Sequence, residues 1–201
     1  MPASRLVIAT HNKGKVDEIR ALLDGIDVEV LSLAEFPHVP PVDETGLTFA
    51  ENAVIKARHA AEATGILAVA DDSGIEVDAL GGRPGVISAR FSGQGATDES
   101  NNRKILDLLK DVPFDRRTAR FVSVIAVCDP AGRAETATGV CEGVVTFEPR
   151  GTSGFGYDPL FLVPQLGKTY AELGLEEKNS VSHRGRALRA ARPILLRMLG
   201  A

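Results

Sequence analysis

The stretch ILAVADDSG, residues 66–74, decides how the rest of the sequence is interpreted. Its first five residues form an apolar run with the length of a buried strand, and such strands are covered on both faces in α/β proteins. Its last four residues favour a turn, because Asp and Ser side chains bond their own backbone and glycine accepts a positive φ. We therefore expect a buried strand that ends at Ala70 and a turn that begins there.

Asp71 and Asp72 are the first candidates for chemistry. Side chains at the C-terminal end of a buried strand can reach a ligand, since the faces of that strand are covered. Adjacent residues of a strand point to opposite faces, so one aspartate would face a given site and the other would need donors of its own. A plain Asp-Asp-Ser-Gly turn accounts for the same residues, so this stretch alone leaves a structural and a catalytic interpretation open.

The composition limits the class of protein. The chain has 201 residues, of which 44% are hydrophobic, so it can form one large domain or two lobes that share a sheet. The net charge of −4 argues against a nucleic-acid-coating protein. No apolar run approaches the ~18 residues of a membrane span. Cys128 and Cys141 have neither zinc-site nor disulfide spacing, so we expect reduced thiols. Together these features predict a cytoplasmic protein with neither nucleic-acid nor membrane partners.

A second candidate site lies between an expected strand at residues 5–10 and an expected helix at residues 15–23. A polar loop with glycine and lysine at a helix N-terminus offers N–H groups and positive charge to a phosphate. It is not a P-loop, because Ala9 stands where that motif needs glycine and Val16 where it needs serine or threonine. A plain connector with exposed lysines is the alternative. The loop residues are Thr10, His11, Asn12, Lys13, Gly14 and Lys15.

An acidic loop and a helix follow a second expected strand, at residues 28–33. Glu44 in the loop could reach a metal, although exposed acids in loops are usually only solvated. Thr48 and Glu51 match a capping box that opens a helix with a stripe of small residues, which predicts close packing. Lys56 lies at the edge of this stripe, so it either points inward or extends to the surface.

The second half of the chain predicts a mixed sheet. Residues 98–109 fit a helix, and residues 118–129 and 133–148 fit a long antiparallel hairpin. Residues 151–159 hold three glycines among hydroxyls and aromatic rings. This composition favours a ligand loop, since glycine permits close backbone approach and an aromatic ring can stack on a nucleobase, although the glycine order fails the dinucleotide fingerprint. Residues 178–185 lead into a closing helix, and His183 and Arg184 lie at its entrance.

Taken together, these stretches resemble the Ham1 family of inosine triphosphate pyrophosphatases over nearly the whole chain. The motifs are TxNxxK at residues 10–15, ETGLTF at 44–49, ADDSG at 70–74, FGYD at 155–158 and SHRG at 182–185. Several separated motifs in the right order are far more specific than any one of them. The resemblance implies that residues 1–201 form a single domain with an elongated, two-lobed α/β fold on a long central mixed sheet flanked by helices. It also implies an active-site cleft between the lobes and a homodimer. His11 stands where many relatives carry glycine.

The resemblance also implies an activity and assigns residues to it. The reaction is Mg²⁺-dependent hydrolysis of inosine, deoxyinosine and xanthosine triphosphates (ITP, dITP and XTP) to the monophosphate and pyrophosphate, which removes these purine nucleotides from the pool. Asp72 would be the general base and, with Glu44, a ligand of Mg²⁺, which is typically held by one or two carboxylates plus substrate phosphates. Residues 10–15, Lys56 and Ser73 would bind the phosphates. The base and sugar would be surrounded by Phe155, Gly156, Tyr157, Asp158, Lys178, His183 and Arg184.

Three other classes fit less well. A Maf-like pyrophosphatase with a different base preference shares the fold, but the TxNxxK pattern favours the Ham1 family. A non-catalytic nucleotide sensor or an interaction protein on the same scaffold is disfavoured, because two adjacent carboxylates would repel one another at a cost in the absence of a metal. A Nudix hydrolase would need a Gly-x5-Glu-x7-Arg-Glu run, which this chain lacks.

Overall fold

The computed structural model describes residues 4–10, 13–23, 25 and 27–200, with the backbone alone at residues 13, 18 and 21–23. The strands are β1 (Ser4–Ile8), β2 (Val28–Ser32), β3 (Leu67–Val77), β4 (Thr118–Cys128), β5 (Ala134–Val145), β6 (Phe161–Val163) and β7 (Lys168–Thr169). The α-helices are α1 (Lys13–Leu23), α2 (Phe49–Thr64), α3 (Asp98–Leu108), α4 (Leu175–Val181) and α5 (His183–Leu199).

The strands form one mixed sheet in the order β2-β1-β3-β4-β5-β6-β7. β1 runs parallel to β2 and β3, whereas β6 runs antiparallel to β5 and β7. β4 and β5 are neighbours joined by the short turn at residues 129–133, as the predicted hairpin requires. The predicted α/β class with a mixed sheet flanked by helices is therefore confirmed.

β3 does not end where the sequence predicts. It continues from Leu67 through both aspartates and Gly74 to Val77, so the turn expected to begin at Ala70 is wrong. β3 lies between β1 and β4, and β4 has the same length of 11 residues. The ladder hydrogen bonds of a central strand satisfy the backbone groups for which Asp and Ser side chains would otherwise compete.

The chain folds into two compact units. The first consists of Met1–Asp72, Ser123–Gly139 and Arg184–Ala201, and the second of Ser73–Val122 and Val140–His183. The single domain and the cleft between lobes that the sequence implies stay predictions.

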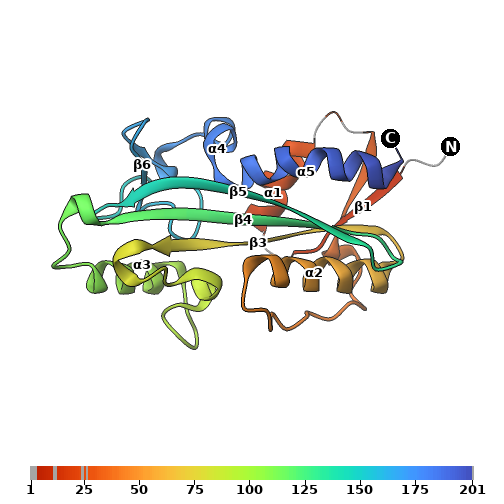
Figure 1. The fold of residues 1–201 in the computed structure, drawn as a ribbon, viewed down its shortest axis with the longest axis horizontal. Coiled ribbons are helices and arrows are strands. Elements are labelled where there is room, and N and C mark those ends of the chain that lie inside the picture. The colour runs from red at the N-terminus through yellow and green to blue at the C-terminus, as the bar shows by residue number, and fades with distance from the viewer. Residues whose placement is uncertain (1–3, 11–12, 24, 26, 201) are drawn as a thin grey trace. The chain divides into compact units, whose positions relative to one another are not determined.

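In the first unit, helices cover both faces of the sheet (Figure 1). α2 lies on one face, and α1 and α5 lie on the other. On the face of α1 and α5, Ile19 and Leu195 pack with Leu67 and Val69 of β3. On α2, the predicted stripe of small residues is fully buried, which lets the helix lie close to the sheet; its members are Ala53, Ala57, Ala60 and Ala61.

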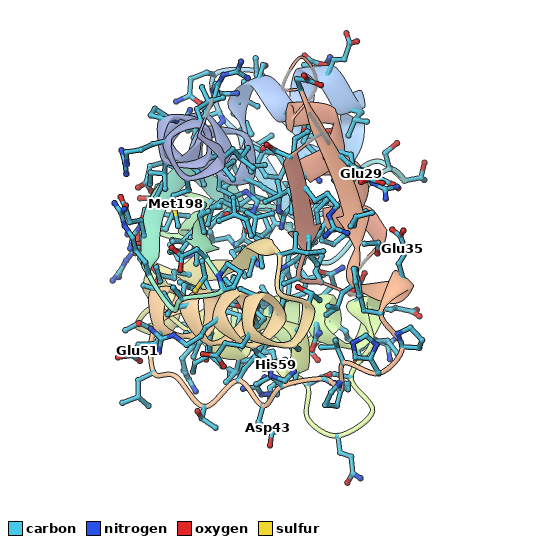
Figure 2. The ribbon with its side chains drawn as sticks, turned by 90° about the vertical axis from the view of Figure 1, so that its right-hand side faces the viewer. Glu29, Glu35, Asp43, Glu51, His59 and Met198 are labelled. Carbon is cyan, nitrogen blue, oxygen red and sulfur yellow. The ribbon has the colours of Figure 1, made fainter. Side chains whose placement is uncertain are left out.

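The loop before α2 runs along the outer side of that helix, as Figure 2 shows for Asp43 and His59. His59 Nε2 donates a hydrogen bond of 2.8 Å to the Pro40 carbonyl oxygen. At the end of the loop, the predicted capping box is present, with Thr48 accepting from the Glu51 N–H and Glu51 accepting from the Thr48 N–H. These bonds fix the segment that carries Glu44.

The second unit has its own core, which is rich in aromatic rings. The ring centre of Phe121 on β4 lies 4.7 Å from that of Phe161 and 5.5 Å from that of Tyr170. Ile105 of α3 and Ile75 of β3 belong to the same core. None of the described helices is both long and apolar enough to cross a membrane.

Candidate active site

Asp71 and Asp72 leave β3 on opposite faces of the sheet. The side chain of Asp71 points to the same face of β3 as those of Leu67 and Val69, which pack on the side of α1 and α5. The side chain of Asp72 points to the opposite face, where it accepts a hydrogen bond from Lys56 of α2. Both side chains are buried. The expectation that only one aspartate of the pair faces a given site is confirmed by these partners.

Donors from three elements hold Asp71. Its Oδ2 lies 2.6 Å from Lys15 Nζ of α1 and 3.3 Å from Arg184 Nη2 of α5, and the Ser123 hydroxyl of β4 donates to Oδ1. Burial acts to raise the pKa of Asp71, but the charges of Arg184 and Lys15 outweigh it and hold the pKa well below its usual value. Asp71 is therefore a carboxylate anion whose donors are already in place.

Lys56 joins Asp72 to Glu44. Its Nζ lies 2.7 Å from Asp72 Oδ1 and 2.9 Å from Glu44 Oε1, and only 14% of its side chain is exposed, so it points inward. Burial lowers the pKa of Lys56, but the charges of Asp72 and Glu44 more than reverse this. For Asp72, burial raises the pKa, and the opposing charge of Lys56 does not cancel this effect.

The residues at Lys56 fit a magnesium ion. Asp72 Oδ2 is buried and has no hydrogen-bond partner among the described residues, which is costly unless a cation or a donor joins it. Glu44 supplies a second carboxylate, and Mg²⁺ is commonly bound by one or two carboxylates plus substrate phosphates. The described residues contain no group of three or more His, Cys, Asp or Glu that could hold a metal. Phosphate oxygens would therefore have to contribute ligands.

In the second unit, Lys178 and Asp158 form a buried ion pair. Lys178 Nζ lies 2.7 Å from Asp158 Oδ2, and the same oxygen accepts a 2.9 Å hydrogen bond from the Phe155 N–H. The Lys178 ammonium also lies 4.9 Å from the centre of the Phe155 ring. The ion pair thus fixes the conformation of the glycine-rich loop that the sequence predicts to bind a ligand.

The same loop forms one wall of a pocket of about 470 Å³, and α3 forms another. Gly156 is tied to α3 from both sides, because its N–H donates to Asp98 at 2.7 Å and its carbonyl accepts from Asn102 at 2.9 Å. Tyr157 is buried, and its hydroxyl donates to the Ser88 carbonyl at 2.7 Å. The phenol of Tyr157 therefore anchors the loop to the core.

His183 and Arg184 begin α5, as the sequence predicts, but their partners differ. The His183 ring is buried and stacks on Phe121 with 4.5 Å between ring centres. The Arg184 guanidinium binds Asp71, as described above. Two consecutive residues at one helix start thus belong to the aromatic core of the second unit and to the charged cluster of the first.

Some predicted phosphate-loop residues cannot be placed. His11 and Asn12 lie outside the described residues, and for Lys13 only the backbone is described. Gly14 and Lys15 lie in the first turn of α1. The residues that sequence reasoning missed are Ser123, Asp98 and Asn102, because their roles depend on which strands and helices become neighbours.

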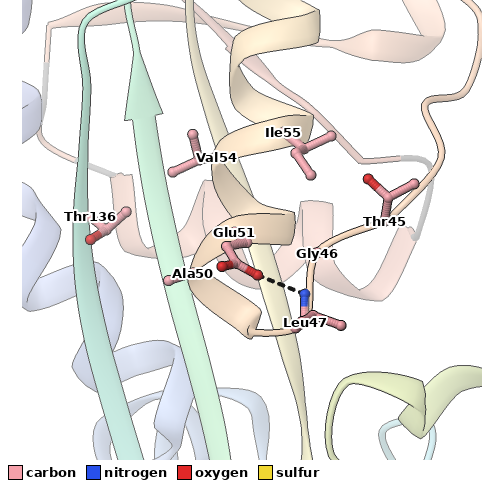
Figure 3. A pocket seen from close by; sticks show the side chains of 8 residues that line it. All are labelled: Thr45, Gly46, Leu47, Ala50, Glu51, Val54, Ile55 and Thr136. Atoms are coloured by element: carbon pink, nitrogen blue, oxygen red, sulfur yellow. Dashed lines mark hydrogen bonds between the residues drawn. The ribbon is translucent and has the colours of Figure 1, made fainter.

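A second pocket, of about 590 Å³, lies in the first unit between the start of α2 and β5 (Figure 3). The Glu51 carboxylate accepts a hydrogen bond of 2.6 Å from the Leu47 N–H at its edge. None of the predicted site residues lines it; its walls are Thr45, Gly46, Leu47, Ala50, Glu51, Val54, Ile55 and Thr136.

The fold and these clusters define a class of protein: an α/β protein with a mixed sheet, in which buried carboxylates are paired with lysines. The model of the Ham1 family matches residues 6–194, and the chain belongs to this family.

Relatives and solved structures agree over almost the full length. The chain is 57% identical over 194 residues to a dITP/XTP pyrophosphatase of Desulforamulus reducens, with 96% of each chain covered. It is 58% identical over 185 residues to one of Geobacter sulfurreducens, covering 92% of this chain and 93% of that protein. The structure of a HAM1 protein from Coxiella burnetii has a TM-score of 0.88 at 43% identity and covers 96% of this chain and 99% of that one. The structure of the Staphylococcus aureus Ham1 protein has a TM-score of 0.85 at 39% identity and covers 96% of this chain and 98% of that one.

The Lys178–Asp158 pair leads to a prediction about Gly154. Gly154 has φ +80°, and a Cβ there would overlap Asp158 Oδ2. We expect Gly154→Ala to lower the free energy of unfolding by about 3 kcal/mol or more, because it combines left-handed strain with a disturbed buried ion pair. Urea denaturation measures the loss.

Gly156→Ala is the matched control. Gly156 has φ +61° but nothing within 4 Å of its Cβ position, so only the backbone strain of about 1–2 kcal/mol applies. Equal losses in the two variants would show that the buried ion pair adds nothing to the stability of the loop.

Proposed function

We propose that this protein hydrolyses ITP, dITP and XTP to the nucleoside monophosphate and pyrophosphate. The observation that carries the proposal is the cluster at Lys56, where Glu44 and Asp72 meet at one ammonium group and Asp72 keeps a buried oxygen without a partner among the described residues. The names of the Desulforamulus and Geobacter relatives support the substrate class. The proposal includes a homodimer in the cytoplasm, as the sequence leads us to expect.

The start of α1 and two lysines of the first unit, together with Ser73, would bind the triphosphate. The start of α1 offers backbone N–H groups and the positive end of the helix dipole, which favour a phosphate. Lys15 and Lys56 add positive charge, and each is already oriented by a carboxylate. The two lysines are close enough that the charge of Lys15 also acts on Asp72. Ser73, which follows Asp72 on β3, supplies a hydroxyl for the same purpose.

Asp72 would act as the general base. Mg²⁺, held by Glu44 and Asp72 together with phosphate oxygens, would neutralise the charge that builds on the leaving pyrophosphate. Asp72 accepts a proton from water as the water oxygen bonds to the α-phosphorus. The bond from the α-phosphorus to the oxygen that bridges to the β-phosphorus breaks, and its electron pair leaves with pyrophosphate. The pKa of Asp72, which burial raises, favours acceptance of this proton.

Lys178 and Phe155 of the second unit and Arg184 at the start of α5 would select the base. Inosine and xanthosine carry an oxygen at C6, where adenosine carries an amino group. Lys178 and Arg184 are hydrogen-bond donors without acceptor capacity, so they can donate to an oxygen at C6 but can accept nothing from the amino group of adenosine. Phe155 offers an aromatic ring beside Lys178 for stacking. Guanosine shares the 6-oxo group, so its 2-amino group must be rejected by a separate contact.

The products test the function. With Mg²⁺ and ITP we expect one inosine monophosphate and one pyrophosphate per turnover, because attack falls on the α-phosphorus. Selection by unpaired buried donors can reach about 10⁴-fold, so kcat/KM for ITP should exceed that for ATP by a factor of this order. Chromatography of the nucleotides and a pyrophosphate assay measure the products and the rates with ITP and ATP, with a reaction lacking Mg²⁺ as the control. Orthophosphate release with accumulation of inosine diphosphate would rule out the proposed reaction.

The variant Asp72→Asn tests the assigned base. Asparagine is nearly isosteric but cannot take the proton, so kcat should fall by about 10²–10⁴-fold while circular dichroism shows an intact fold. Asp43→Asn is the control, since Asp43 is an exposed acid on the loop that carries Glu44. The activity of this variant should match that of the wild type. Near-normal turnover of folded Asp72→Asn would mean that another group accepts the proton.

A further inference from the structure

We propose that Asp71 is a positioning residue that couples triphosphate binding to base selection. This inference rests on the proposed function, in which Lys15 binds phosphate and Arg184 contacts the base. Asp71 has no role of its own in that function. Its side chain is fully buried, so it acts through the groups that it holds.

The geometry places both cations on a single carboxylate oxygen. Lys15 Nζ lies 2.6 Å and Arg184 Nη2 lies 3.3 Å from Asp71 Oδ2. Lys15 comes from the first turn of α1 and Arg184 from the first turn of α5, so one side chain of β3 holds the starts of two helices. The Ser123 hydroxyl, which donates to Oδ1, fixes the orientation of the carboxylate.

The exposure of the two cations differs in the way that this role requires. The Lys15 side chain is 15% exposed and can still reach a ligand, whereas that of Arg184 is 2% exposed and is confined by its surroundings. The charges of Arg184 and Lys15 would repel one another without the anion between them. A neutral side chain at position 71 would therefore let the two cations move apart, and the Arg184 guanidinium would lose its fixed orientation.

Loss of Asp71 should not affect all triphosphates equally. A misplaced Lys15 weakens binding of every triphosphate by the same factor, since all substrates share the phosphates. A misplaced Arg184 weakens only substrates with a 6-oxo group. Loss of Asp71 should thus lower kcat/KM for ITP more than for ATP, whereas a purely structural loss would lower the amount of active protein and leave the ratio unchanged.

The test is Asp71→Asn, measured with ITP and ATP in separate kcat and KM determinations. We expect the ITP-to-ATP ratio of kcat/KM to fall by about tenfold or more, as for loss of a charge-assisted hydrogen bond. Val69→Ala is the matched control, because Val69 lies on the same face of β3, is fully buried and carries no charge. It should lower stability through a cavity and keep the ratio within about twofold of the wild type.

Each outcome decides one question. An unchanged ratio in Asp71→Asn overturns the positioning role, and a wild-type enzyme without preference for ITP overturns the proposed function instead. If Asp71→Asn does not fold, Ser123→Ala replaces it, since that change removes only the hydroxyl that orients the carboxylate. We expect a smaller fall in the ratio, and a ratio equal to that of the wild type would overturn the inference.

Discussion

The side-chain alternation of β3 is the constraint on which the rest of the site depends. Because the strand continues through Asp71 and Asp72, two consecutive carboxylates point to opposite faces of one sheet. α1 and α5 meet the first aspartate, and α2 meets the second. A turn at this point would have allowed both carboxylates to face the same side, where they would repel one another. The continuous strand gives each aspartate its own cations and its own task.

Much of this arrangement follows from the sequence, because its signals are local. The capping box at Thr48, the small-residue stripe of α2 and the position of His183 at a helix start are short-range patterns, and the structure confirms them. The predicted end of β3 is wrong, because the turn preference of Asp-Asp-Ser-Gly is a local signal. The strand ladder that overrides this preference is formed with β4, which is distant in the sequence. The role of Ser123 depends on strand register, which no local pattern encodes.

The buried charges are hard to explain by stability alone. An ion pair such as Lys178–Asp158 loses hydration energy that its Coulombic attraction only partly restores, and an apolar pair of similar size would often be as stable. Asp71 with Lys15 and Arg184 repeats this pattern in the first unit. In both places the ion pair orients a lysine. Such prearranged cations are expected where a polyanionic substrate must be held in one geometry.

The most direct test of the division between the two aspartates is Mn²⁺ binding, followed by electron paramagnetic resonance in substrate-free protein. We expect Asp72→Asn to weaken Mn²⁺ binding by about tenfold or more, because a ligand is lost. Asp71→Asn should change it by no more than about threefold, because that carboxylate faces the other side of the sheet. Equal weakening in both variants would contradict the assignment of the two carboxylates to separate tasks.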